Sequence, residues 1–228
     1  MKSTIKSLMH IIICGILLFS LSCKEKVTTP TVAPEKSIKE ITGFATALNI
    51  QISKKIYSLV SMLPNDAAYR DEWWLFTVDI PDGRMVQVKL QFQDVSGNIQ
   101  QTYDTKATKY MRAIGQAIGS NDLMNYSVEF FKTGFIWYPH EELFCFNGSY
   151  NYKGYKASIS ATDYLCLPGI PKLPDFYPDQ GGIGVTVYVA NGSRVTVTYN
   201  GTRFASATFT YQGVLYHFII DLDTGQIS

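Results

Sequence analysis

The chain lacks the residue patterns that most enzyme active sites require. Its 228 residues include three histidines, and only His140 and His217 lie outside the apolar N-terminal run. No G-x-S-x-G motif is present that would supply a serine nucleophile for either histidine. His140 is followed by two glutamates but by no second histidine, so the zinc-protease pattern H-E-x-x-H is incomplete. Neither G-x-G-x-x-G nor a P-loop occurs. We therefore expect a protein that is not an enzyme and holds no metal or cofactor.

Charge is also sparse and evenly divided. Charged residues make up 17% of the chain, with 20 basic and 19 acidic side chains scattered along it. Loss of residues 1–22 would remove Lys2 and Lys6 and no acid, leaving a formal charge of −1. Proteins that bind nucleic acid gather basic residues on one face, because phosphate contacts dominate their affinity. A nucleic-acid partner is therefore not expected.

Cysteine is scarce, and two of the four cysteines lie near the N-terminus. Cys14 falls within the apolar run and Cys23 directly follows it, which leaves Cys145 and Cys166 in the rest of the chain. No C-x-x-C motif supports redox catalysis. In an exported protein these two residues are candidates for one disulfide. The alternative is two buried free thiols, which are common core residues.

The N-terminus carries a short export signal. Lys2 and Lys6 precede an apolar stretch, residues 8–21, that is too short for a membrane-spanning helix. Its end, Ser20-Leu21-Ser22-Cys23, resembles the signal of bacterial lipoproteins, although Ser20 departs from the family's leucine. The resemblance implies cleavage before Cys23 and attachment of lipid to that cysteine, with simple secretion as the alternative. A lysine directly after the lipidated cysteine, here Lys24, resembles the sorting signal of outer-membrane lipoproteins in some Gram-negative bacteria. We therefore expect an envelope protein held at the outer membrane or cell surface.

A polar linker follows. Residues 23–36 carry Pro30 and Pro34 and no periodic apolar pattern. Such a segment cannot bury enough apolar surface to offset its ordering entropy, so it should act as a tether. The expected organisation is a signal peptide over 1–22, a lipidated tether over 23–36 and one domain over 37–228.

The domain should open with a long amphipathic helix over residues 37–62. Ser37 and Glu40 form an S-x-x-E capping box, and the proline after Leu63 should end the helix. One stripe recurs at spacings of three and four: Ile38, Ile41, Ala45, Leu48, Ile52, Ile56 and Leu59. This stripe predicts a helix that covers a sheet.

The remaining sequence alternates as β-strands do. Strands are expected over residues 73–78, 86–92, 99–104, 126–131, 143–152 and 155–162, and over four C-terminal segments between residues 184 and 222. Residues 108–118 are predicted as a short helix, and the prolines between 167 and 180 indicate a loop. The expected fold is mainly β, of the α+β class: an antiparallel meander, sandwich or half-barrel with the N-terminal helix packed on it.

Several short motifs read as turns. The C-terminal part weakly resembles uncharacterised, secreted or lipid-anchored bacterial β proteins through Tyr177-Pro178, Gly181-Gly182, Asn200-Gly201 and the segment 221–225. That resemblance implies a location and a fold, but no activity. Asp221 and Asp223 have the spacing that opens a calcium loop, yet no acid follows at the twelfth position, so a terminal turn is expected. Asn147-Gly148 is also predicted as a turn.

Three functions are compatible with these features. The first is a non-enzymatic binding or structural role in the envelope, with the membrane as partner through lipidated Cys23 and an envelope protein as a further partner. The second is a carrier in which a cavity beneath the helix holds a hydrophobic small molecule. The third is recognition of glycan or protein through exposed aromatic residues such as Trp73, Trp74, Trp137 and Tyr138.

Overall fold

The computed structural model describes residues 34–228, apart from residues 61, 80–82, 105, 119–122, 133–141, 154, 162–164, 167–176, 179–184 and 190–191. Residues from Ala33 to Ser228 form one compact unit. Cys23 and most of the predicted tether lie outside the described residues. Within the described part, no helix combines the length and the apolar character needed to cross a bilayer.

A single long helix, α2 (Pro34–Leu59), opens the domain. It begins three residues before the predicted start, because proline is well suited to the first helical position, where its missing N–H is not needed. The predicted capping box is therefore wrong: Ser37 lies inside the helix, 5% exposed. The helix also ends before the predicted 62, since the amides of Val60 and Met62 bond carbonyls three residues back, a common tightening ahead of a proline.

The predicted apolar stripe is confirmed. Its residues from Ile38 to Ile56 are buried, and Leu59 packs against the core. A second row, Thr42, Thr46, Asn49 and Ser53, is equally buried although it is polar. Two of these polar residues bond tyrosines of the sheet, as described below. The helix thus meets the sheet through apolar contacts and specific hydrogen bonds together.

The strands form one antiparallel sheet. Its path follows β1 (Ala68–Arg70), β2 (Trp73–Asp79), β3 (Met85–Gln93), β5 (Tyr110–Ile118), β6 (Leu123–Lys132), β7 (Glu142–Tyr152), β8 (Tyr155–Ala161), β10 (Val185–Val189), β11 (Arg194–Thr198), β12 (Phe204–Tyr211) and β13 (Val214–Asp221). Two short strands lie off this path, with β4 (Ile99–Gln100) on β3 and β9 (Leu165–Cys166) on β7. The predicted α+β class and the four-stranded C-terminal meander are confirmed.

Three local predictions differ from the structure. Residues 110–118 are strand β5 and not a helix, because their backbone pairs with both β3 and β6 and their buried positions alternate, as Met111 and Ala113 show. Asn147-Gly148 is not a turn, since it lies within β7. The predicted strand over 99–104 is reduced to β4.

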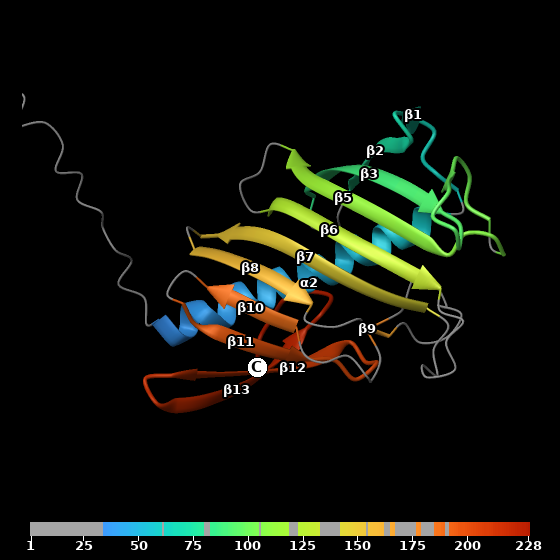
Figure 1. The fold of residues 1–228 in the computed structure, drawn as a ribbon. Coiled ribbons are helices and arrows are strands. Elements are labelled where there is room, and N and C mark those ends of the chain that lie inside the picture. The colour runs from blue at the N-terminus through green and yellow to red at the C-terminus, as the bar shows by residue number, and fades with distance from the viewer. Residues whose placement is uncertain are drawn as a thin grey trace, which may run out of the picture. The chain divides into compact units, whose positions relative to one another are not determined.

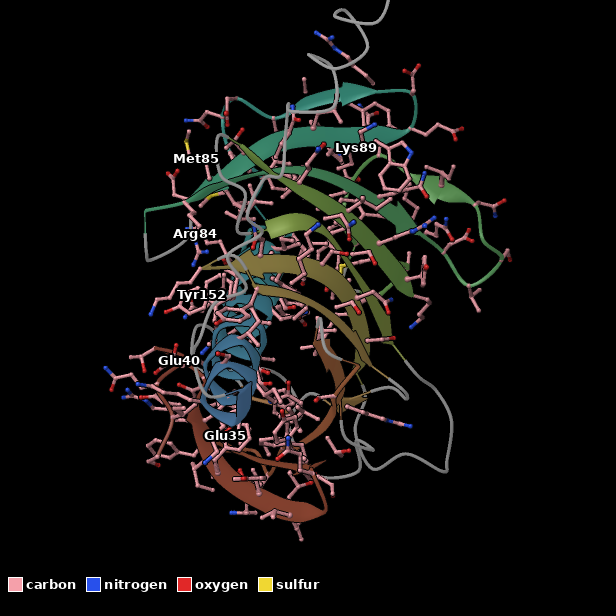
Figure 2. All side chains as sticks on the ribbon, turned by 90° about the vertical axis from the view of Figure 1, so that its left-hand side faces the viewer. Glu35, Glu40, Arg84, Met85, Lys89 and Tyr152 are labelled. Atoms are coloured by element: carbon pink, nitrogen blue, oxygen red, sulfur yellow. The ribbon has the colours of Figure 1, made fainter. Side chains whose placement is uncertain are left out.

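The sheet curves around the helix. Figure 1 shows α2 running behind the sheet, and Figure 2, seen from the side, shows the sheet arching around it from β2 and β3 to β13. The concave face supplies the core, with Val88, Phe92, Val128 and Phe146 all fully buried. The convex face carries polar residues such as Gln87 and Asn147. The face of α2 turned away from the sheet is therefore where a surface site can form.

Candidate binding cleft

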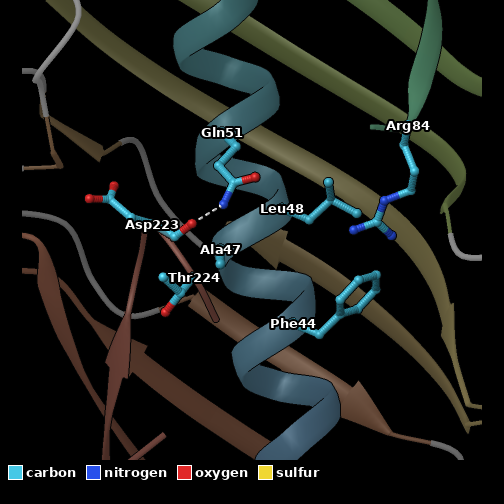
Figure 3. Close-up of a pocket in the computed structure, with 7 residues that line it drawn as sticks. All are labelled: Phe44, Ala47, Leu48, Gln51, Arg84, Asp223 and Thr224. Carbon is cyan, nitrogen blue, oxygen red and sulfur yellow. Dashed lines mark hydrogen bonds between the residues drawn. The ribbon is translucent and has the colours of Figure 1, made fainter. Parts of the chain in front are cut away.

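A small cleft lies on this outward side of α2. Its volume is about 210 Å³. Four helix residues form its floor and the two sides come from elsewhere in the chain: Phe44, Ala47, Leu48 and Gln51 from α2, Arg84 ahead of β3, and Asp223 and Thr224 after β13. Figure 3 shows Arg84 on one side of the helix and Asp223 and Thr224 on the other. Segments about 140 residues apart in sequence thus meet over one helix face because the sheet wraps around it.

Aromatic rings and cations line one side of the cleft. Phe44 stacks on Tyr152 of β7, with ring centroids 4.5 Å apart and planes 20° apart. The guanidinium of Arg84 lies 4.7 Å from the Phe44 ring, and the ammonium of Lys153 lies 4.9 Å from the Tyr152 ring. Figure 2 shows Arg84, Tyr152 and Glu40 along the same side of the domain. Cations over aromatic faces are attracted by the ring quadrupole, so this stack is ordered without a ligand.

A second hollow continues the first. It has a volume of about 390 Å³ and shares Phe44 and Thr224 with the cleft. Lys153 at its rim forms an ion pair with Glu40, at 3.8 Å. Hydrogen bonding to Tyr152, with a smaller contribution from Glu40, raises the pKa of Lys153, which stays charged at neutral pH. The combined groove offers an apolar floor with polar and charged walls, a common composition for sites that bind amphipathic molecules.

The wall made by the C-terminal turn is held by a network of charged and polar groups. Arg203 donates to both carboxylate oxygens of Asp221, at 2.8 and 2.5 Å, and lies 3.3 Å from Asp223. The Tyr177 hydroxyl donates to Asp223 at 2.8 Å. The side-chain amide of Gln51 donates to the main-chain oxygen of Asp223, which joins the turn to the helix. The hydrogen bonds from Arg203 lower the pKa of Asp221 to about 2.

The same network accounts for part of the C-terminal sequence pattern. Tyr177, Pro178 and Gly201 meet there, since the amide of Gly201 donates to the carbonyl of Pro178 at 2.7 Å. Asp221 and Asp223 are engaged by Arg203 and Tyr177, and the predicted terminal turn is confirmed by the bond from the Gly225 amide to the Asp221 carbonyl. Among the described residues no cluster of three metal-ligating side chains occurs.

Two glycines let the C-terminal turn reach the helix. Gly225 has a φ of +73°, which glycine adopts without strain. A β-carbon at Gly43 would overlap the carbonyl oxygen of Gly225 and lie 2.9 Å from the Ile227 side chain. The helix and the turn therefore touch backbone to backbone at this point, which sets the width of the neighbouring hollow.

Beneath the helix, two tyrosines fix its position. The Asn49 side chain donates to the Tyr150 hydroxyl at 2.8 Å, and the hydroxyls of Ser53 and Tyr126 share a short hydrogen bond. Burial raises the pKa of Tyr150 well above its usual value, so this hydroxyl stays protonated. At these contacts the space between helix and sheet is filled by side chains.

Each tyrosine also lies over a glycine of the sheet. A β-carbon at Gly148 would overlap the Tyr150 ring and hydroxyl, and one at Gly115 would lie 3.5 Å from the Tyr126 ring and 2.8 Å from Val86. This explains Gly148 within a strand: the position must leave room for the tyrosine two residues on. The Asn-Gly pair indicated a turn from composition alone, whereas the packing of Tyr150 determines the conformation.

Of the histidines and tryptophans singled out from the sequence, the structure describes His217, Trp73 and Trp74, and none of these three lines the cleft. Cys23, His140, Trp137 and Tyr138 lie outside the described residues. His217 faces outward on β13, where its ring nitrogen lies 3.2 Å from the Ser206 hydroxyl. No described carboxylate is bonded to that ring, so the pair is not a catalytic triad.

Trp73 and Trp74 do not form a shared platform. Both are half-buried, and Trp74 donates its ring N–H to the carbonyl of Gln101. Because they are consecutive in β2, they point to opposite faces of the sheet.

The two candidate disulfide cysteines lie on neighbouring strands. Cys145 is in β7 and Cys166 in β9, where Cys166 pairs with Leu143. The register makes the two cysteines diagonal neighbours, whose α-carbons lie about 7–8 Å apart. This distance exceeds the usual separation of the α-carbons in a disulfide. A bond would therefore require the two-residue strand β9 to slide along β7. The disulfide stays a prediction.

Sequence reasoning missed Phe44, Arg84 and Tyr152. Phe44 offered a signal, because it lies off the apolar stripe and places a large aromatic ring on the otherwise polar side of the helix. Nothing in the local sequence of Arg84 or Tyr152 indicates that they approach this ring. Comparisons with protein-family models, with curated proteins and with solved structures gave no match.

Proposed function

We propose that this protein is a lipid-anchored component of the bacterial envelope that acts by binding and not by catalysis, with the groove over α2 as its binding site. The single observation that carries the site is the convergence of three separate segments on the outward face of the helix. The anchor rests on the apolar run that ends at Cys23 and on the polar tether after it.

The groove favours a small amphipathic ligand. Phe44, Ala47 and Leu48 give the groove an apolar floor, and the charged guanidinium of Arg84 lies at its margin. An apolar group would lie against the floor and a polar or anionic group would face Arg84. The site is prepared for this, because Phe44 is held between Arg84 and Tyr152 and the C-terminal wall is tied to Arg203.

A probe of matching chemistry tests the site. We expect 8-anilinonaphthalene-1-sulfonate, an aromatic sulfonate, to bind the full-length protein saturably, followed by its fluorescence. Thr224→Trp should fill the groove from an exposed position and weaken binding at least about tenfold. Thr198→Trp, at an exposed position on the convex face of β11, serves as the matched control and should bind as the wild type does. Equal binding by the two variants would contradict the assignment.

The anchor has its own test. Cys23→Ser should leave the chain without lipid, so that the variant is either unprocessed or found in the soluble fraction after cell breakage. The intact mass of the wild-type protein, extracted from membranes, should begin at Cys23 and include the lipid. A wild-type mass without lipid, together with unchanged membrane retention of the variant, would rule out lipidation.

A hydrophobic carrier is the second candidate. The carrier hypothesis expected a cavity beneath the helix, but there Asn49 contacts Tyr150 and Ser53 contacts Tyr126. The groove offers a different location for the ligand. Its ligand would lie on the outward face of α2. The groove's mixed polar and apolar lining favours an amphipathic molecule over a purely hydrophobic one.

A further inference from the structure

The contact between α2 and the sheet contains buried polar atoms without a partner. Thr46 and Asn49 of the helix are 0% exposed, and Tyr199, directly after β11, is 4% exposed. The Thr46 hydroxyl, the Asn49 side-chain oxygen and the Tyr199 hydroxyl bond no other residue that the structure describes. Buried polar atoms are almost always paired, because an unpaired one costs free energy once it is removed from water. These three atoms therefore require a hydrogen-bond partner.

Two other hydroxyls on the buried side of α2 show how such groups are normally satisfied. Thr42 donates to the carbonyl of Ile38 at 2.6 Å, and Ser53 donates to the carbonyl of Asn49 at 2.9 Å. Serine and threonine within a helix often make this bond to the carbonyl four residues back. Thr46 does not make it. Its hydroxyl is therefore available to a partner outside the helix.

The three unpaired atoms face the same region. Thr46 and Asn49 are three residues apart and so are neighbours on one side of the helix. The Asn49 side-chain nitrogen donates to the Tyr150 hydroxyl at 2.8 Å, which places this turn of the helix against β7. Burial raises the pKa of Tyr199, and the charge on nearby Tyr150 would raise it further, so Tyr199 reaches towards the same place.

We propose that one buried water molecule lies between α2 and the sheet and joins Thr46, Asn49 and Tyr199. Asn49 uses its N–H group for Tyr150, so its remaining oxygen can only accept, whereas a hydroxyl can donate or accept. The water donates to Asn49 and accepts from Tyr199, and Thr46 completes the set in either role. Three hydrogen bonds are the usual number for a buried water.

Water suits this site better than an ion or an organic ligand. The three side chains and the Tyr150 hydroxyl beside them are neutral, so a buried ion would have no opposite charge to offset its lost hydration. All four residues are at most 4% exposed, which favours a molecule small enough to be enclosed as the chain folds. The water site is independent of the groove, which lies on the outward face of α2.

Crystal structures of the full-length protein in detergent, at a resolution that defines ordered water, test the position. The wild type should show one isolated density peak about 2.5–3.2 Å from Thr46 Oγ1, Asn49 Oδ1 and Tyr199 Oη. The double variant Thr46→Val, Tyr199→Phe keeps the size of both side chains but removes two of the three partners, so it should lack the peak. A direct hydrogen bond between Thr46 and Tyr199 without a peak, or density for a larger molecule, would overturn the proposal.

A count of enclosed waters tests the same site in solution. Oxygen-17 magnetic relaxation dispersion detects waters that stay inside a protein while it tumbles, and the double variant should hold one fewer than the wild type. Thr42→Val is the matched control, because it makes the same change one turn earlier, at a hydroxyl that Ile38 already satisfies. It should keep the wild-type number. An equal count in wild type and double variant, or the same loss in Thr42→Val, would contradict the assignment. If the double variant does not fold, the wild-type density alone decides.

Discussion

At the residue scale, Gly43 decides how closely the C-terminal turn can approach the helix. Glycine within a helix normally costs about 1 kcal/mol relative to alanine. Here the position is kept free of a side chain because the carbonyl of Gly225 occupies the space that a β-carbon would need. The helix preference therefore favours alanine at position 43, whereas the contact with the turn favours glycine.

Gly43→Ala should destabilise the protein by about 1–3 kcal/mol instead of stabilising it, because the turn must move away from the helix. Urea unfolding followed by circular dichroism measures the change. Lys55→Ala, at an exposed helix position, is the control and should change stability by less than about 0.5 kcal/mol. A Gly43→Ala protein more stable than the wild type would show that the turn does not rest on the helix.

Asn49 and Tyr150 form the second decisive contact at this scale. Removing one partner leaves the other buried and unsatisfied, so each single change should cost more than the bond itself is worth. In a double-mutant cycle with Asn49→Ala and Tyr150→Phe, we expect a coupling of about 1 kcal/mol. Additive effects of the two changes would mean that the hydrogen bond does not stabilise the helix position.

At the element scale, the C-terminal turn depends on its ion pairs. The pKa of Asp221, held near 2 by Arg203, lies below its usual value of 3.8. A carboxyl whose pKa is lowered on folding stabilises the protein above its unfolded pKa. This stabilisation is lost as the pH falls from about 4 to about 2.

Arg203→Gln should raise the pKa of Asp221 towards its ordinary value and flatten the dependence of stability on pH between 4 and 2. The titration is followed by carbon NMR of the Asp221 carboxyl group. The effect on stability at neutral pH should be modest, because Arg203 is partly exposed and solvent screens the pair. An unchanged midpoint in the variant would show that the main-chain donors of the turn, and not Arg203, set this pKa.

Strands β7 and β9 carry the two cysteines of the predicted disulfide. If it forms, alkylation of the exported, unreduced protein should leave Cys145 and Cys166 unmodified in the intact mass, and reduction should cost about 3 kcal/mol of stability. Cys145→Ser should then make Cys166 reactive after denaturation. Alkylation of both cysteines in the denatured wild type, before any reduction, would show two free thiols and agree with the diagonal register.

Elements were predictable from the sequence where side-chain periodicity is strong. The stripe of α2 and the alternation of β3 and β11–β13 identify their structures because one face of each is buried. The apolar residues of 110–118 fit both the helical and the strand period. Pairing with β3 and β6 makes this segment a strand, and that pairing cannot be read from the local sequence. Gly115 in that segment weakens a helix and makes room for the Tyr126 ring.

At the scale of the whole molecule, the groove arises from curvature that no single segment encodes. Arg84 and Asp223 lie far apart in sequence and reach the same helix face because the sheet arches around α2. The sequence indicates a helix and a sheet, but not the angle through which the sheet turns. The residues of the site were therefore not predictable, apart from the signal offered by Phe44.

The central claim is that the anchored domain binds a small amphipathic molecule in the groove over α2. The most direct measurement is native mass spectrometry of the full-length protein, extracted from membranes in mild detergent and compared with Thr224→Trp. We expect the wild type to carry lipid and a non-covalent small-molecule adduct that collisional activation releases, and the variant to carry lipid alone. An adduct of equal abundance on both proteins, or on neither, would contradict the claim.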